Sequence, residues 1–265
     1  MITSIIQNKK LKKYAKPAAF ALSAVFWLLV WQIIYLIVGS DVIVASPIAT
    51  FKRVFELAGT PYFWLCVGNS IINVLIGFAL ALCLSIILAA LSNRFIVFEY
   101  LFSPLIKLVR ATPVASFIVL ALFWLNDGVP SFIVFLMVVP LIYSNLTVGL
   151  KNVDKNLLEM AQIYKFSFLK KIRLIYIPSL MPYFVSACSV GLGFGWKAGI
   201  AAEVIGLPKN TLGLEIYNSK IYIETIDLFA LTAVIIILSI LLEKVFMFLL
   251  SRLSKRILKG GAEND

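Results

Sequence analysis

The sequence predicts an all-α, polytopic integral membrane protein with six transmembrane helices and both termini in the cytoplasm. Three observations support this prediction. Of the 265 residues, 62% are hydrophobic, well above the share in a soluble globular domain. The apolar residues form runs of the length that a helix needs to cross a bilayer. The Lys and Arg residues gather in alternate connections between these runs, as the positive-inside rule predicts for cytoplasmic segments.

The predicted spans are separated by charged residues, prolines and polar turns. The first run, from Ala18 to Val38, carries no charge and as a helix would be about 31 Å long. A basic N-terminus (1–17) and a basic C-terminal tail (251–265) flank the predicted membrane domain, 18–250. The approximate bounds of the six spans are 18–38, 69–91, 104–126, 129–150, 182–203 and 228–250.

The distribution of basic residues predicts the orientation. The four inner segments hold five, three, six and four Lys and Arg residues, whereas the outer segments together hold four. The formal net charge of +11 is therefore explained by membrane topology, and nucleic-acid binding is not expected. In the second inner segment, Lys107 and Arg110 are interpreted either as anchors whose charges reach the lipid surface or as contacts of a gate or an ATPase.

Two further features concern the connections and the cysteines. Ser46 is a predicted helix cap and Pro47 a first helical residue, so 47–57 is predicted to be an amphipathic helix along the outer membrane surface. The three cysteines lie in or beside apolar runs, without a CxxC pair and without any His in the chain. Neither a disulfide framework nor a metal site is expected.

A charged segment, about 151–181, separates the fourth and fifth spans and predicts two short helices at an angle. Asp154 can cap the first helix and Ser167 the second, and Pro178 is expected to end the second. The first helix has an apolar stripe at the spacing i, i+3, i+4 and i+7, formed by Leu157, Met160, Ala161 and Tyr164. Such a segment can contact a partner on the inner side, or it can lie on the lipid surface.

One pattern in this segment is specific. Glu159-Met160-Ala161 is followed after three residues by Lys165, and after nine more by Ile175-Tyr176-Ile177-Pro178. This spacing resembles the EAA loop of ABC importer permeases, which reads Glu-Ala-Ala, three residues, Gly, nine residues, Ile-x-Leu-Pro. The resemblance implies that the loop consists of cytoplasmic coupling helices that contact an ATPase. The residues implied in this contact are Glu159, Met160, Ala161, Tyr164, Lys165, Phe166, Ser167 and Pro178.

Lys165 stands where the family has glycine. A glycine at a turn indicates a positive φ, which would cost a Lys about 1 kcal/mol more. We therefore expect the turn to be shaped differently in this chain.

The predicted fifth span combines small and charged residues. Gly191, Gly195 and Gly199 recur every fourth residue, a pattern typical of close helix packing in membranes. The stretch from Trp196 to Glu203 reads Trp-Lys-x-x-x-Ala-Ala-Glu and resembles nitrate, sulfonate and taurine permeases. Charges at Lys197 and Glu203 are costly in a bilayer, so each needs a partner or a wet cavity. Trp196, Lys197 and Glu203 are the candidates for the translocation pathway or its gate, with a structural role as the open alternative.

Together, the resemblances imply the transmembrane subunit of a type I ABC importer in the cell membrane of a bacterium. They imply a second permease subunit, most simply an identical one, two cytoplasmic ABC ATPases and an extracellular solute-binding protein. The chain has no G-x-x-x-x-G-K-[ST] motif and no catalytic constellation, so ATP and Mg²⁺ are expected on the partner ATPase and no cofactor on this chain. The rival hypotheses are an ion-coupled secondary transporter, which would show ionisable residues in matched halves, and a membrane enzyme.

Overall fold

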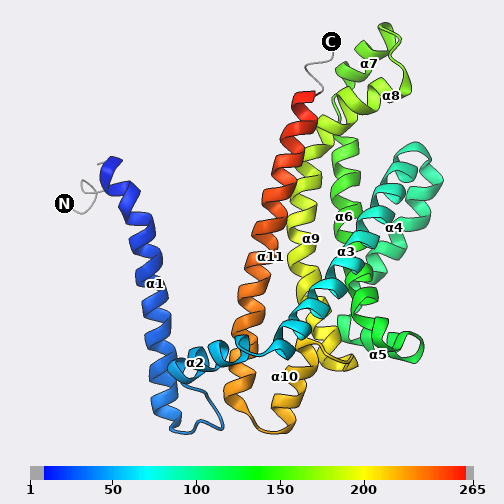
Figure 1. Ribbon diagram of the computed structural model, residues 1–265. Coiled ribbons are helices and arrows are strands. Elements are labelled where there is room, and N and C mark those ends of the chain that lie inside the picture. Colours follow the sequence, from blue (N-terminus) through cyan, green and yellow to red (C-terminus); the bar gives the residue numbers. More distant parts are fainter. Residues whose placement is uncertain (1–8, 261–265) are drawn as a thin grey trace. The chain divides into compact units, whose positions relative to one another are not determined.

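The computed structural model describes residues 9–260, and that range contains helices joined by short turns, with no strand (Figure 1). The first eight residues of the predicted N-terminal segment and the last five of the predicted tail lie outside the described residues. The elements are α1 (Lys9–Val38), α2 (Pro47–Ala58), α3 (Pro61–Arg94), α4 (Ile96–Ala111), α5 (Val114–Leu125), η2 (Asn126–Gly128), α6 (Val129–Lys151), α7 (Lys155–Ile163), α8 (Phe168–Lys171), η3 (Ile172–Tyr176), α9 (Ile177–Gly206), α10 (Leu212–Ile221) and α11 (Thr225–Gly260). The prediction of an all-helical membrane protein is confirmed.

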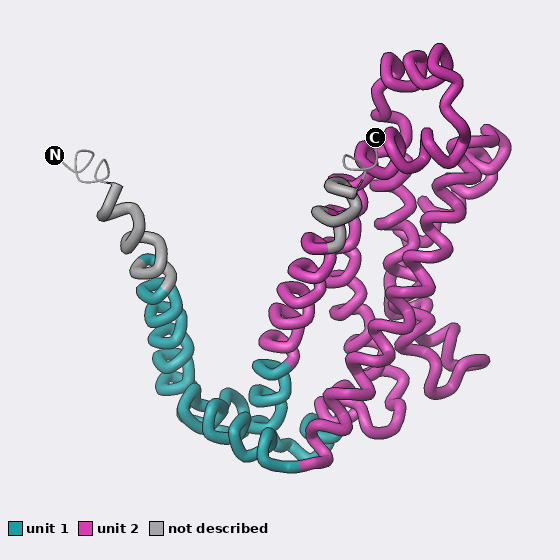
Figure 2. The backbone as a smooth tube through the Cα atoms, turned by 45° about the horizontal axis from the view of Figure 1, so that its top comes forward, with its two compact units in different colours: residues 1–60, 218–234 teal, residues 61–217, 235–265 magenta. Residues whose placement is uncertain are grey.

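The helices form two compact units (Figure 2). Among the described residues, one unit takes those before Pro61 together with 218–234, and the second takes 61–217 and those from Ile235 onward. In the first unit, Arg53 of α2 makes two hydrogen bonds to the Asp227 carboxylate of α11, at 2.6 and 2.8 Å. The helix predicted at 47–57 is present as α2, where Ser46 Oγ accepts a hydrogen bond from the Ala49 N–H at 3.2 Å.

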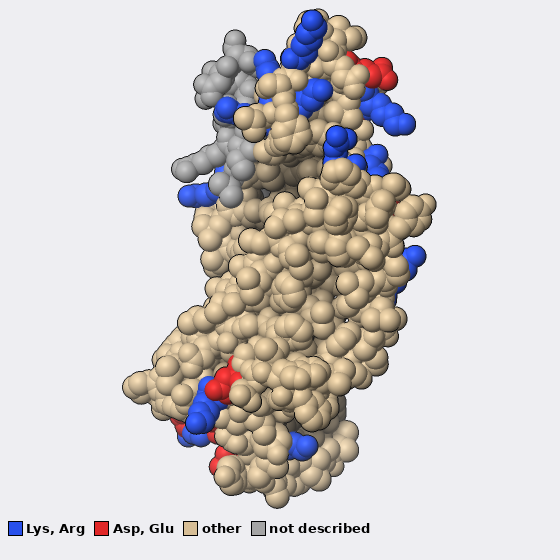
Figure 3. Space-filling model, turned by 90° about the vertical axis from the view of Figure 1, so that its right-hand side faces the viewer, with Lys and Arg blue, Asp and Glu red and all other residues tan. Residues whose placement is uncertain are grey.

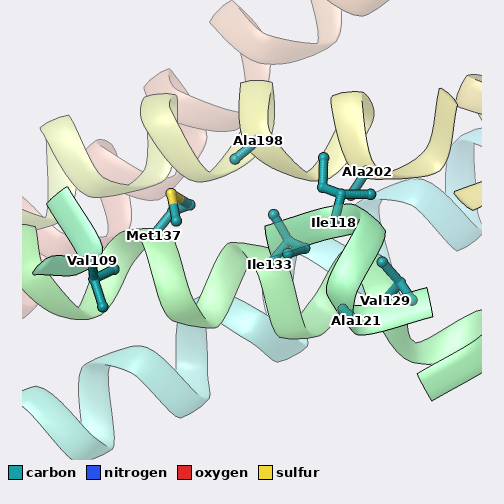
Figure 4. Packing of buried hydrophobic residues seen from close by; sticks show 8 residues of the cluster. All are labelled: Val109, Ile118, Ala121, Val129, Ile133, Met137, Ala198 and Ala202. Carbon is teal, nitrogen blue, oxygen red and sulfur yellow. The ribbon is translucent and has the colours of Figure 1, made fainter. Parts of the chain in front are cut away.

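In the second unit α6 is the central helix, and α3 and α9 pack along it. One of its apolar clusters joins four helices, α4, α5, α6 and α9 (Figure 4). The cluster consists of Val109, Ile118, Ala121, Val129, Ile133, Met137, Ala198 and Ala202. Small residues on α9 face larger ones on α5 and α6, so the backbones of these helices approach closely.

Five helical stretches of the described chain are long and apolar enough to cross a membrane. They are Ala21–Val38, Pro61–Arg94, Val114–Lys151, Phe168–Gly206 and Thr225–Arg252. The difference from the predicted six lies at 104–126, where Thr112 and Pro113 separate α4 from the 12-residue α5. Thr112 is extended, with φ −82° and ψ 132°, because the ring of a following proline disfavours the helical conformation.

The predicted end of the second short helix at Pro178 is wrong. The chain is helical from Phe168 to Gly206 without a break, and Pro178 and Pro182 both lie inside this stretch. Residues 172–176 form a π-helical turn, in which the Ile177 N–H bonds back to the Ile172 carbonyl. We attribute the continuity to this wider turn, since π-turns accommodate local departures from the regular helical ladder. The charged segment therefore leads directly into α9.

The Arg110 side chain makes hydrogen bonds within the protein, to α6. Its guanidinium donates hydrogen bonds to the Pro140 carbonyl at 2.9 Å and to Ser144 Oγ at 2.8 Å. The side chain thereby ties the end of α4 to the proline-containing part of α6.

Candidate functional site

The charged segment consists of α7, the turn 164–167 and α8, and is here called the coupling segment. Asp154 Oδ1 accepts a hydrogen bond from the Asn156 N–H at 2.9 Å, and Ser167 Oγ accepts one from the Lys170 N–H at 3.3 Å. Both predicted caps are therefore present. Ala161 is fully buried against Val153 and Ile175, which anchors α7 to the start of the long helix. The other three residues of the predicted stripe are exposed, so that stripe is not the one that packs on the protein.

The turn after α7 has the shape that a glycine would give it. Lys165 has φ +51°, in the left-handed region, so the prediction of a differently shaped turn is wrong. The Lys165 N–H bonds to the Gln162 carbonyl at 3.0 Å, and the Phe166 N–H bonds to the Ala161 carbonyl at 2.9 Å. This is the hydrogen-bond pattern of the Schellman motif, and Phe166 packs on the cluster around Ala161 as that motif requires. We infer that these contacts offset the cost of about 1 kcal/mol for a left-handed Lys.

Substitution of Lys165 tests this account. Lys165→Gly should keep the turn and relieve a strain of about 1 kcal/mol. Lys165→Val should destabilise the turn, because a β-branched residue is disfavoured further at positive φ. Hydrogen–deuterium exchange at the Phe166 amide measures both effects. Equal exchange in the wild type, Lys165→Gly and Lys165→Val would show that the turn is not under this constraint.

The coupling segment exposes a set of large apolar side chains on its surface. We call this set the coupling patch, and it consists of Leu157, Met160, Ile163, Tyr164, Phe168 and Leu169. Lys and Arg side chains gather at this end of the second unit on the face shown in Figure 3, and the adjoining band is largely free of charge. The carboxylate of Glu159 is exposed on the same short helix. An exposed apolar patch rimmed by charges is typical of a protein–protein contact.

The three glycines predicted for helix packing lie on α9 against α3 and α6. A Cβ atom on Gly199 would lie 2.9 Å from both Val134 and Val74, and one on Gly195 would lie 3.0 Å from Val138. Gly191 is less constrained, since its nearest neighbour would be Val138 at 3.3 Å.

The three pathway candidates have different environments. Trp196 is buried, and its Nε1 donates a hydrogen bond to the Ile235 carbonyl at 3.2 Å. Lys197 is exposed on α9 between two buried neighbours. Glu203 is fully buried, and its carboxylate accepts hydrogen bonds from Ser70 Oγ at 2.7 Å and Asn73 Nδ2 at 3.3 Å. Lys197 and Glu203 therefore do not form a pair.

Sequence reasoning missed some of these partners. Ser70 and Asn73 share one face of α3 at the spacing i, i+3, a polar pair within an apolar run that could have been noticed. It also passed over Glu243, a carboxylate inside the last span, which accepts a hydrogen bond from Ser189 Oγ at 2.9 Å.

Comparison with known proteins agrees with this arrangement. The family of binding-protein-dependent transport system inner membrane components matches residues 81–259. The chain belongs to this family. It is 27% identical to a nitrate import permease of Synechocystis over 75% of the chain and 76% of the relative. It is 23% identical to a taurine transport permease of Escherichia coli, over 80% of each chain. A putative aliphatic sulfonate permease of Bacillus subtilis is 25% identical over 83% of this chain and 80% of the relative. The predicted resemblance to permeases of ABC importers in the nitrate, sulfonate and taurine branch is confirmed.

Proposed function

We propose that this chain forms the translocation pathway of an ATP-driven importer for a small solute, and that a separate ATPase drives it through the coupling segment. The observation that carries the proposal is the coupling segment itself. It presents exposed apolar side chains and Glu159 on a capped, tightly turned structure that continues as helix into α9. A rigid segment joined to a long helix can transmit a push from a partner to the membrane region.

The proposed assembly contains two copies of this chain and two ATPases. A hydrolytic ABC site needs two ATPase subunits, and each copy supplies one coupling segment, so two-fold symmetry is the simplest arrangement. ATP and Mg²⁺ would bind to the ATPases, and an extracellular binding protein would deliver the solute. The nitrate, taurine and sulfonate permeases among the relatives make these three solutes the first to test for this chain.

The proposed topology has six crossings with both termini in the cytoplasm of a bacterial cell. In it, α4 and α5 together make the third crossing, with the coupling segment on the inner side and α10 on the outer side. The excess of Lys and Arg in the inner segments supports this arrangement. Of the pathway candidates, Lys197 is exposed and would face the pathway, whereas Trp196 and Glu203 are buried next to it.

Glu159→Ala tests the ATPase contact. Because the Glu159 side chain is exposed, its truncation should leave the membrane fold intact. We expect loss of one charged contact to weaken ATPase attachment about tenfold or more. Co-purification of an ABC ATPase from native membranes, followed by titration of its binding to membranes that hold this chain, measures the effect. Asp127→Ala removes an exposed carboxylate from the turn at η2 and should change nothing. Normal ATPase attachment to the Glu159→Ala chain would remove Glu159 from the contact, and failure of the wild type to bind any ATPase would contradict the proposed function.

A further inference from the structure

The buried Glu203 carboxylate lies at the start of α10. The first N–H groups of any helix have no acceptor inside the helix. Here the Gly213 N–H donates to Glu203 Oε2 at 3.2 Å, and the Leu212 N–H donates to Ser70 Oγ at 3.0 Å. Side chains usually cap a helix from the residue just before it, and Thr211 Oγ1 accepts from the Leu214 N–H in this way at 3.4 Å. The acceptors for the two preceding N–H groups, of Leu212 and Gly213, come from α3 and α9.

The two Glu203 side-chain oxygens accept hydrogen bonds from three donors. Ser70 Oγ and the Gly213 N–H donate to Oε2, and Asn73 Nδ2 donates to Oε1. Ser70 takes part twice, because its hydroxyl donates to Glu203 and accepts from Leu212.

The backbones of α9 and α10 are in close contact where Glu203 meets Gly213, a place here called the joint. A Cβ atom on Gly213 would lie 2.2 Å from the Glu203 Cβ and 2.7 Å from the Val204 nitrogen. The first turn of α10 therefore rests directly on the last turn of α9, without a side chain between them. A sliding movement of one helix end against the other would break the hydrogen bonds to Glu203.

The loop between the two helices is also held. Leu207 and Asn210 both adopt positive φ, at 53° and 54°, and the Asn69 Nδ2 of α3 donates to the Asn210 carbonyl at 2.9 Å. This hydrogen bond ties the loop between α9 and α10 to α3.

We propose that Glu203 is a positioning residue that holds α10, α9 and α3 together as one moving block, so that a displacement of the coupling segment reaches α10. The contact between the coupling segment and an ATPase rests on the proposed function, whereas the hydrogen bonds that join α9, α3 and α10 at Glu203 do not. Because the helix is unbroken from Phe168 to Gly206, the coupling segment and Glu203 lie at opposite ends of one continuous helical stretch. Glu203 would thus act at a distance from the ATPase contact, through α10, without itself binding solute.

The experiment uses Glu203→Leu in the full chain, purified with its ATPase and reconstituted in lipid. Leucine has no hydrogen-bond acceptor in its side chain, so the hydrogen bonds from Ser70 Oγ, Asn73 Nδ2 and the Gly213 N–H to Glu203 are lost. We expect amide exchange at Leu212 and Gly213 to become about tenfold faster. Exchange in the coupling segment and attachment of the ATPase should not change. Uptake per ATP hydrolysed should fall at least tenfold, with nitrate, taurine and an alkanesulfonate as probes.

Two further variants separate the joint from general damage to the fold. Ser70→Ala keeps the carboxylate but removes one of its donors and the acceptor of the Leu212 N–H, so exchange should become faster at Leu212 in particular. Glu224→Leu makes the same chemical change at an exposed position after α10 and should match the wild type. Unchanged exchange at Leu212 and Gly213 in both Glu203→Leu and Ser70→Ala would show that these hydrogen bonds do not join the helices. Faster exchange at Leu212 and Gly213 together with normal uptake would show that these hydrogen bonds are not needed to transmit the displacement of the coupling segment. If the wild type binds no ATPase, the proposed function fails, and the exchange data still decide whether Glu203 joins the helices.

Discussion

Gly77→Ala is expected to destabilise the membrane domain far more than Gly68→Ala on the same helix, α3. A Cβ atom at Gly77 would lie 2.3 Å from the Ser131 carbonyl oxygen and 2.7 Å from the Val134 Cβ. Neither atom is the end of a flexible side chain, so α3 and α6 would have to separate. Overpacking of this kind costs about 1–3 kcal/mol and sometimes more, and we expect the upper end of that range here.

A matched control lies on the same helix. At Gly68 an added Cβ would meet nothing within 4 Å, so Gly68→Ala should be neutral or slightly stabilising, as the helix propensity of Ala predicts. Thermal or denaturant unfolding of the purified chain in detergent measures both variants. Equal unfolding midpoints for Gly77→Ala and Gly68→Ala would contradict the close approach of α3 and α6.

The same comparison on α9 tests the glycine pattern that the sequence shows. Gly199→Ala would press on two valine methyl groups at 2.9 Å, which can move more easily than a backbone carbonyl. Its cost should therefore lie between those of Gly77→Ala and Gly193→Ala, since Gly193 has open space around its Cβ position. The expected order of destabilisation is Gly77, then Gly199, then Gly193.

Features that depend on neighbouring residues in the sequence could be predicted well. The caps at Ser46, Asp154 and Ser167 are each a side-chain oxygen placed just before the helix it caps, and all three are present. The apolar runs identified the long helices for the same reason. Their composition is sufficient, because a membrane span needs only length and the absence of charge.

Features that depend on tertiary contacts or on a local compromise were missed. The left-handed turn at Lys165 is accompanied by the packing of Phe166 on the cluster of Val153, Ala161 and Ile175, a contact that the glycine preference at this position does not take into account. Pro178 was expected to end a helix, and the π-helical turn before it could not be inferred from a preference against proline. In the candidate site, the charged residues of α9 were identified, but the two side-chain donors to Glu203 come from a helix more than 100 residues earlier in the chain.

Lys197→Met is expected to reduce transport about tenfold or more while leaving the fold intact. Lys197 is exposed on α9, and within the described chain no carboxylate lies close enough to form an ion pair with it. Its position is nine residues before Gly206, or about 14 Å along the helix, so its charge does not reach the nearer helix end easily. A lysine in such a place is disfavoured by about 2.5–3.5 kcal/mol on insertion scales unless it meets water or a partner.

The cost is accounted for if Lys197 faces the water-filled pathway in the assembled importer. Methionine keeps most of the length and removes the charge, so packing against the buried neighbours Trp196 and Ala198 should persist. Lys197→Arg should retain much of the transport, because it keeps the charge. Lys244→Met is the matched control, an exposed lysine on the last long helix, and should transport as the wild type does. Uptake of nitrate, taurine and an alkanesulfonate, measured with the cognate ATPase and binding protein, decides the matter. If Lys197→Met transports as well as Lys244→Met, the charge of Lys197 has no part in the pathway, and the proposed lining of that pathway must be sought on another helix.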